Sequence, residues 1–251
     1  MQNTYLLVLT ATITPDSSIR LARSDPGLRR QDYFNAFCYW LNHNDPRLSR
    51  ILLVENSGAD LADFRLVASR SKKKTEFVSL PAERLPPGLH YGYGELAMLD
   101  LALAQSRLRL ETTHMIKVTG RLLFPGLPKL LRRLPANFGL AVDARRNLPF
   151  RRSANGFIPT QLLIASHDFY DFHLRRCYRE LKPQYPYYIE NLFFDRLRAM
   201  HDVQGILWRY PVNCEPLGSA AHAHKRYDHP TRTLITMLRA FFRVVAPGFW
   251  F

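Results

Sequence analysis

The stretch "HMIKVTGRLLFPGLPKLLRRLP", residues 114–135, decides the fold class of this chain. An apolar run over 114–118 stops at the polar tripeptide "TGR", and a Pro-rich turn and a basic amphipathic segment follow. A strand, a polar elbow and a helix in this order are typical of a site at the carboxyl edge of a parallel sheet. The stretch therefore predicts a strand over 114–118, a short helix over 125–134 and a ligand site between them.

The rest of the N-terminal half alternates in the same way. Apolar runs predict strands, helical spacing of apolar residues predicts helices, and the two types take turns along the chain. The predicted strands are 5–13, 49–57 and 75–80. A helix is predicted over 31–44, with Asp32 near its start, and the segment 91–108 is predicted to turn on its glycines and then to become a helix. This alternation predicts an α/β domain with a Rossmann-like, mostly parallel sheet flanked by helices.

The C-terminal half is mixed, with strands predicted at 138–146 and 158–166 and helices at 166–181 and 188–200. No internal repeat or low-complexity linker divides the chain. We therefore expect one domain over residues 1–230, followed by a distinct amphipathic tail over residues 231–251.

The composition indicates a folded protein with an anionic partner. The 251 residues are 47% apolar and 12% aromatic, which argues against disorder. A formal net charge of +14 predicts binding to nucleic acid, an anionic membrane surface or phosphorylated small molecules, and does not choose among them.

The cysteines and the amino terminus indicate a cytoplasmic protein. Three widely separated cysteines form no disulfide framework and no Cys-x-x-Cys zinc pattern, which fits a reducing compartment. The first 15 residues lack the basic start of a signal peptide and suit a first strand. No apolar run approaches the roughly 18 residues of a membrane-spanning helix.

Polar residues that follow the predicted strands form the first candidate site. Ligands of such sheets bind beyond the carboxyl ends of the strands. Glycines there let a ligand approach the backbone, and the arginine fork fits phosphate oxygens. The alternatives to ligand binding are that the glycines only form a tight turn and that the arginine lies on the surface and pairs with an acidic side chain. The candidates are Thr10, Thr12, Glu55, Asn56, Gly92, Gly94, Glu95, Lys117, Thr119, Gly120 and Arg121.

"YYIENLFFDRL", residues 187–197, supplies a candidate general base. Glu190 precedes a helix rich in leucine and phenylalanine. A carboxylate held against aromatic side chains has a raised pKa and can remove a proton. Stabilisation of the helix N-terminus by an acid is an equally good explanation on pattern alone.

"HAHKRYDH", residues 222–229, concentrates histidines and basic residues. A zinc site would need more ligands than this segment supplies. A basic loop closing over a diphosphate is the preferred interpretation, and a solvated loop is the alternative. The residues proposed for this role are His222, His224, Lys225 and Arg226.

The tail "TRTLITMLRAFFRVVAPGFWF", residues 231–251, predicts an amphipathic helix with apolar residues on one side and arginines on another. Cationic and aromatic residues together are typical of a helix on an anionic bilayer. A terminal helix docked on the core, or a dimer interface, would use the same pattern.

The order of these segments resembles the GT-A fold of nucleotide-sugar glycosyltransferases. In that family a strand leads into an Asp-x-Asp motif that holds a divalent metal, where this chain has "IKV" followed by "TGR" and "LLFPGLPKLLRRL". "YYIEN" is similar to the family's acidic motif at a helix start, and "HAHKRYDH" stands where members place basic residues over the diphosphate. "KVTGR" is also similar to bacterial enzymes of capsule and O-antigen assembly.

The resemblance implies a glycosyltransferase that moves a sugar from a nucleotide-sugar donor to a glycan acceptor, which we expect to be lipid-linked, at the inner membrane face. Glu190 takes the position of the inverting base, and Arg121 with the basic loop replaces the metal, so that no cofactor is expected. Asp143 and Arg145, in "AVDARRN", are assigned to the acceptor. Asp143 also keeps open the alternative of an enzyme that uses Mn²⁺ or Mg²⁺.

A nucleic-acid-binding protein without catalytic activity is the competing hypothesis, because the charge and the aromatic content suit it. No helix-turn-helix, RNP-type or zinc-finger pattern supports it, and the basic residues are spread over several loops. A P-loop phosphotransferase is disfavoured because the chain lacks Gly-x-x-x-x-Gly-Lys-Ser/Thr.

Overall fold

The computed structural model describes residues 3–17, 21–82, 85–89, 91–146, 156–183, 188–200, 202–219, 227 and 230–246. Its α-helices are α1 (Pro26–Asn42), α2 (Ala62–Ala68), α3 (Tyr91–Gln105), α4 (Leu127–Arg133), α5 (His167–Phe169), α6 (Ile189–Ala199) and α7 (Pro230–Val245). Its strands are β1 (Tyr5–Ala11), β2 (Arg50–Glu55), β3 (Lys74–Ser79), β4 (His114–Thr119), β5 (Leu140–Ala141), β6 (Arg145–Arg146), β7 (Gly156–Phe157), β8 (Leu162–Ser166) and β9 (Ile206–Leu207).

A seven-stranded sheet in the order β3-β2-β1-β4-β8-β5-β9 forms the centre of the described structure. The first four strands of that order are parallel, with β1 between β2 and β4. Only β8 runs against its neighbours β4 and β5. The expected class, a mostly parallel α/β sheet, is therefore confirmed, and the carboxyl ends of β1, β2 and β4 share one edge with the beginning of β8.

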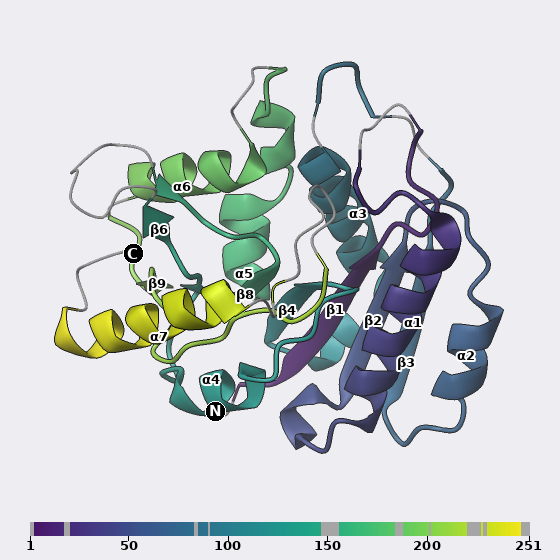
Figure 1. The fold of residues 1–251 in the computed structure, drawn as a ribbon, viewed down its shortest axis with the longest axis horizontal. Helices are drawn as coiled ribbons and strands as arrows, with labels where there is room; N and C mark the ends of the chain where they lie inside the picture. The colour runs from purple at the N-terminus through teal and green to yellow at the C-terminus, as the bar shows by residue number, and fades with distance from the viewer. Residues whose placement is uncertain are drawn as a thin grey trace.

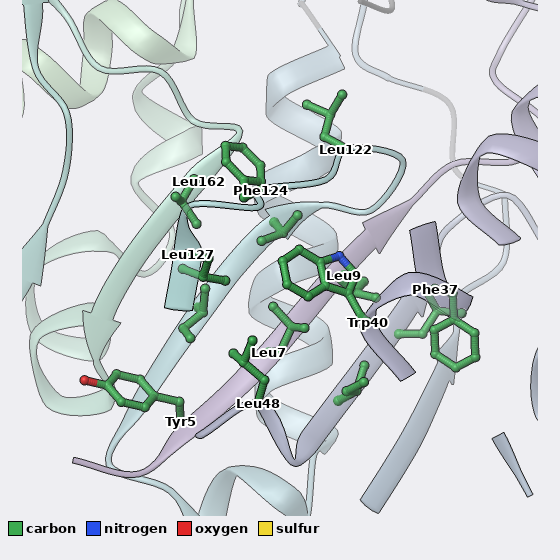
Figure 2. Close-up of a cluster of buried hydrophobic side chains, with 14 of the residues drawn as sticks. Tyr5, Leu7, Leu9, Phe37, Trp40, Leu48, Leu122, Phe124, Leu127 and Leu162 are labelled. Carbon is green, nitrogen blue, oxygen red and sulfur yellow. The ribbon is translucent and has the colours of Figure 1, made fainter. Parts of the chain in front are cut away.

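Helices cover both faces of this sheet (Figure 1). Along β1, Leu7 and Leu9 belong to one buried cluster and Leu6 and Val8 to another, as the alternation of side chains along a strand requires. The first cluster contains residues of α1, α2 and α4, and the second contains residues of α3, α5 and α6. Figure 2 shows part of the first cluster, in which Trp40 of α1 lies over Leu7 and Leu9. The central strands of the sheet are therefore buried on both faces, which leaves the edge formed by the strand ends for a ligand.

Several predicted boundaries were wrong. Helix α1 begins at Pro26, because the Asp25 side chain accepts a hydrogen bond of 2.7 Å from the backbone N–H of Leu28. Asp32 lies inside that helix and pairs with Arg23. The strand predicted over 138–146 is reduced to β5 and β6, and α2 and β9 were not predicted.

The helix predicted over 166–181 is broken into pieces. It consists of α5, a π-helical turn at Tyr170–Leu174 and a 3₁₀ turn at Cys177–Glu180. Arg176, with a φ of 63°, separates the two turns. Two further 3₁₀ turns lie at Pro46–Leu48 and Leu108–Glu111.

The predicted tail helix is present as α7, which lies beside the β9 end of the sheet (Figure 1). One stripe of its surface is exposed and apolar, and consists of Leu234, Met237, Leu238, Phe241, Val244 and Val245. The opposite side carries Arg239 and Arg243, which face the domain and pair with Glu215 and Asp143. These two arginines therefore do not present their charge to a bilayer. Within the described ranges, no helix has the length and apolar character needed to cross a membrane.

Candidate functional site

A cavity of about 420 Å³ opens where the carboxyl ends of β1, β2 and β4 meet the first turn of α3. We call it the edge cavity. The predicted ligand-binding residues Thr10, Thr12, Asn56, Gly94, Glu95, Thr119 and Arg121 all line it. Residues 10, 56 and 119 come together because β1 is hydrogen-bonded to both β2 and β4. These seven residues, which the sequence predicted to bind a ligand beyond the strand ends, therefore lie around one cavity.

A buried ion pair forms the floor of the edge cavity. The Lys117 ammonium donates hydrogen bonds to Glu95 Oε1 at 2.7 Å and to the Thr160 carbonyl at 2.6 Å. The hydroxyls of Thr10 and Thr119 donate to the same Glu95 oxygen at 2.8 and 2.9 Å. Burial alone would raise the pKa of Glu95, but the Lys117 charge and these hydrogen bonds outweigh it and lower the pKa. Glu95 is thus an anion, and Lys117 is fully occupied by protein groups.

Arg121 supplies a cationic group at the wall of the edge cavity. Its Nη1 donates a hydrogen bond to the Ser219 carbonyl, which orients the guanidinium. Within the described part of the chain, Nε and Nη2 of Arg121 make no hydrogen bond. The side chain therefore retains donors that fit the oxygens of a phosphate group.

Among the described residues that were predicted to bind the donor, four do not line the edge cavity. Both Glu55 carboxylate oxygens accept hydrogen bonds from backbone N–H groups, among them those of Ile13 and Ala59, so Glu55 fixes the loops after β1 and β2. Lys117 lies beneath the cavity.

Gly92 and Gly120 are packing glycines. A Cβ atom at Gly92 would lie 2.5 Å from Ile189 Cγ2, and one at Gly120 would lie 2.8 Å from the Thr10 carbonyl oxygen. Gly92 and Gly94 also lie within α3, not in a turn before the helix as predicted. Close approach of a ligand is therefore not the reason for the glycine at either 92 or 120.

Sequence reasoning missed Arg29, which also lines the edge cavity. Its Nε donates to the Thr12 carbonyl at 2.7 Å, its Nη1 to the Arg23 carbonyl at 3.0 Å and its Nη2 to the Tyr33 hydroxyl at 3.0 Å. Arg29 therefore holds the segment after β1 in place over the cavity. In the sequence, Arg29 falls on the apolar face of a helix, and this unusual placement of an arginine could have identified it as a candidate.

A second cavity, of about 730 Å³, lies between the beginning of β8, the start of α6 and the inner side of α7. We call it the tail cavity. Its wall contains Asp143 and Arg145, the residues assigned to the acceptor, together with Glu215, and it contains Ile235, Thr236 and Arg239 of α7. The predicted acceptor residues thus lie in a different cavity from the predicted donor residues.

Glu190 lies in the wall that the two cavities share, with Tyr91, Gln161 and Tyr227. Burial raises the pKa of the Glu190 carboxyl, and the negative charge of Glu95 raises it further. Its only hydrogen bond from a described side chain is a long one, 3.4 Å, from the Thr160 hydroxyl. A half-buried carboxyl with a raised pKa and little hydrogen bonding is suited to accept a proton.

The beginning of α6 positions Glu190. The backbone N–H of Tyr188 donates to Asn191 Oδ1 at 3.1 Å, so that Asn191 caps the helix. The Glu190 carbonyl accepts a hydrogen bond of 3.0 Å from the backbone of Ile158. Asn191, which stands where the resemblance would place an acid, therefore has a structural role beside Glu190.

Asp143 does not fit the alternative role of a metal ligand. Its carboxylate lies 2.7 Å from Arg243, 3.0 Å from Arg145 and 3.5 Å from Arg209. Three guanidinium groups around one carboxylate make the position unfavourable for a divalent cation. Elsewhere in the described ranges, no three His, Cys, Asp or Glu side chains come together as a metal site would require.

The basic loop predicted to close over a diphosphate lies outside the described residues. This concerns His222, His224, Lys225 and Arg226. Tyr227, the next residue, is described and lines both cavities.

Comparisons with known proteins give structural matches only, since no protein-family model and no curated protein matches the chain. The glycosyltransferase GlyE of Streptococcus pneumoniae matches with a TM-score of 0.46 and 9% identity, over 82% of this chain and 45% of that one. The inositol-1-phosphate CTP transferase of T. maritima matches with a TM-score of 0.48 and 12% identity, over 97% of each chain. S. aureus TarS 1-349 matches with a TM-score of 0.40 and 8% identity, over 81% of this chain and 57% of that one.

These similar structures include glycosyltransferases, the class that the sequence resembles, alongside nucleotidyltransferases. This chain spans less than half the length of the GlyE chain. All three TM-scores lie below 0.5, so the matches do not decide between the two activities.

Proposed function

We propose that this protein is a glycosyltransferase that moves a sugar from a nucleotide-activated donor to a hydroxyl group of a glycan acceptor. The observation that carries the proposal is the position of Glu190. Its carboxyl lies between two cavities, and its pKa is raised. In this assignment the edge cavity takes the donor and the tail cavity takes the acceptor, so that the proton-accepting group stands where the two substrates meet.

The reaction assigned to this arrangement is a single displacement. The acceptor oxygen attacks the anomeric carbon, and the bond from that carbon to the phosphate oxygen breaks. The electron pair of that bond leaves with the nucleoside diphosphate, and the hydroxyl proton passes to Glu190. The expected outcome is inversion at the anomeric carbon. Retention in the product, observed by NMR, would remove Glu190 from this role.

Arg121 stabilises the leaving group in this proposal. The diphosphate gains negative charge as the bond breaks, and a fixed guanidinium in a partly dehydrated cavity stabilises that charge. The orientation of Arg121 by the Ser219 carbonyl and its remaining N–H donors support the assignment. The proposal needs no metal ion. Loss of turnover in excess EDTA, restored by manganese, would contradict it.

The proposal for the acceptor is based on α7. The helix lines the tail cavity with its inner side and exposes an apolar stripe on its outer side. An apolar stripe on a surface helix is suited to lie in the interface of a bilayer. We therefore assign a lipid-linked acceptor at the inner membrane face, as in bacterial surface polysaccharide synthesis. Residues 1–230 would form the transferase domain, and residues 231–251 would bind the membrane.

The first experiment is a thermal-shift panel with UDP, GDP, dTDP, CDP and CMP, each with and without manganese, followed by turnover of the matching nucleotide sugar. We expect stabilisation by one nucleotide without metal. Arg121→Met should reduce that stabilisation, while Arg132→Met, which removes an exposed arginine of α4, should not. No shift with any nucleotide, together with salt-dependent binding to oligonucleotides, would favour the nucleic-acid hypothesis instead.

A separate variant, Glu190→Gln, tests the catalytic role of Glu190. Glu190→Gln keeps the size of the side chain and removes the base, and we expect turnover to fall by about 10²- to 10⁴-fold with unchanged nucleotide binding. Glu111→Gln is the matched control, because Glu111 pairs with Arg50 and Lys74 at the opposite edge of the sheet. Unchanged turnover of Glu190→Gln would refute the assignment.

A further inference from the structure

Two arginines of α7 connect the helix to the rest of the domain. Arg243 Nη2 donates to both carboxylate oxygens of Asp143 at 2.7 and 2.8 Å, and its Nη1 donates to the Tyr210 carbonyl at 2.6 Å. Arg239 pairs with Glu215 at 3.2 Å. The side chains of the two arginines and the two acids are 6 to 17% exposed, so that both ion pairs are largely shielded from solvent.

The apolar side chains of α7 contribute little to this attachment. Most of them form the exposed stripe, and none that the structure describes belongs to either buried cluster beside the sheet. Ile235, which lines the tail cavity, is still 37% exposed. Burial of apolar surface, at about 25 cal/mol per Å², is the main source of free energy that holds a helix on a domain. The helix α7 therefore lacks most of this contribution.

Buried ion pairs hold a helix less firmly than apolar contacts do. The attraction between the two charges is largely offset by the free energy that is lost when both leave water. Arg243 adds a further cost, because its buried Nε–H has no acceptor among the described residues. We therefore expect the free energy of the closed position of α7 to lie only slightly below that of an open position.

The acids that α7 contacts stay paired when the helix leaves. Arg145, which belongs to the domain, donates to Asp143 Oδ2 at 3.0 Å and to Glu215 Oε1 at 2.9 Å. Neither acid would be left buried without a cation, and water would hydrate Arg239 and Arg243 on the displaced helix. Opening therefore avoids the penalty of an unpaired buried charge.

We infer that α7 is a lid over the tail cavity, held shut by the ion pairs of Arg239 and Arg243 and able to move away while the rest of the fold stays intact. Ile235, Thr236 and Arg239 form part of the cavity wall, so that displacement of the helix opens this wall to solvent. Such a lid controls the entry of any ligand that the cavity binds. The inference goes beyond the proposed function, because it holds with or without glycosyl transfer.

The free cysteines of the chain report the opening without any substrate. Cys214 lines the tail cavity next to Glu215 and is buried, so that movement of α7 uncovers it to a thiol reagent. Cys177 is buried in the cluster on the other face of the sheet and reports unfolding of the whole domain. Cys38 of α1 is half-buried and shows that the reagent is active. The reagent is a maleimide carried on polyethylene glycol, and mass spectrometry follows the loss of each unmodified cysteine peptide.

In the wild-type protein we expect Cys214 to be labelled at least about tenfold faster than Cys177, because local opening requires less free energy than global unfolding. Arg243→Met should accelerate the labelling of Cys214 by a further factor of about ten or more and leave that of Cys177 unchanged. Arg243→Lys, which keeps the charge, should give a rate between those of the wild type and Arg243→Met. Arg132→Met, which removes an exposed arginine of α4, is the matched control and should have no effect.

Equal labelling rates of Cys214 and Cys177 in the wild type would overturn the inference, because α7 would then leave only when the whole fold opens. A Cys214 rate that Arg243→Met leaves unchanged, in a protein with the circular dichroism of the wild type, would overturn it as well. The wild-type comparison decides the question if Arg243→Met does not fold. The proposed function fails separately, through the absence of nucleotide binding and nucleotide-sugar turnover, and the labelling rates do not depend on either.

Discussion

Replacing Lys117 by Met removes the ammonium that neutralises Glu95 on the floor of the edge cavity. The Lys117 side chain is 1% exposed and that of Glu95 is 14% exposed. At their separation of 2.7 Å the attraction amounts to about 6 kcal/mol at an effective dielectric constant of about 20. Much of this offsets the cost of burying both charges, and removing one partner of a buried pair typically costs about 3–5 kcal/mol.

The expected result for Lys117→Met is a fall in Tm of roughly 6–20 °C, since a domain of this size loses about 2–4 °C per kcal/mol. Glu95→Gln should cost a comparable amount, because it leaves the ammonium buried with the Thr160 carbonyl and the Thr119 hydroxyl. The double variant should be no less stable than either single variant, because it buries no unpaired charge. The assay is chemical denaturation of all four proteins, which gives the coupling energy.

Additivity of the two single changes within about 0.5 kcal/mol would refute the reasoning, because residues in contact should couple more strongly than that. The pH dependence gives a second check. The folded-state pKa of Glu95 lies below its ordinary value of 4.5. Its contribution is therefore present above pH 4.5 and lost as the pH falls through the folded-state pKa. The difference in stability between wild type and the double variant should change only in that acidic range.

Three further predictions concern the site and the tail. Because the pKa of Glu190 is raised, kcat/KM should fall as the pH is lowered, with an inflection above pH 4.5. Glu190→Asp, which keeps a carboxyl, should show the same acid-side fall. A kcat/KM that does not change over that pH range would contradict the role of Glu190 as the base. Gly92→Ala should destabilise the fold by about 1–3 kcal/mol and lower turnover, because the new methyl group meets Ile189 next to Glu190; unfolding curves and kinetics measured together would expose an error if neither changed. Met237→Glu with Phe241→Glu on the exposed stripe of α7 should reduce sedimentation with phospholipid vesicles, both neutral and anionic; binding that persists would remove α7 from the membrane contact.

The framework of the sheet could be predicted from the sequence because its strands are buried on both faces. The strands 5–11 and 50–55 contain the continuous apolar runs 5–9 and 51–54, which is the pattern that a sheet covered on both sides requires. The same rule located Thr10, Asn56 and Thr119, because residues at the carboxyl ends of adjacent parallel strands must share an edge.

Tertiary contacts determined the parts that the sequence did not predict. Glu55 carries the residue type of a ligand-binding acid, but it is fully buried and bound by backbone N–H groups, which no local pattern reveals. Gly92 is small because Ile189 of a helix almost a hundred residues later packs on it. Arg239 and Arg243 of α7 pair with acids from distant loops, so their inward direction could not be inferred from the helical wheel alone.

Under the proposed function, the placement of α7 would make acceptor binding and membrane binding thermodynamically reciprocal. One side of the helix forms part of the tail cavity, and its other side is the apolar stripe. If contact with a bilayer changes the orientation of α7, and with it the affinity of the cavity for its ligand by some factor, occupation of the cavity must change the affinity for the bilayer by the same factor. A filled cavity would then retain the protein on the surface from which its acceptor came, and release of product would loosen that attachment.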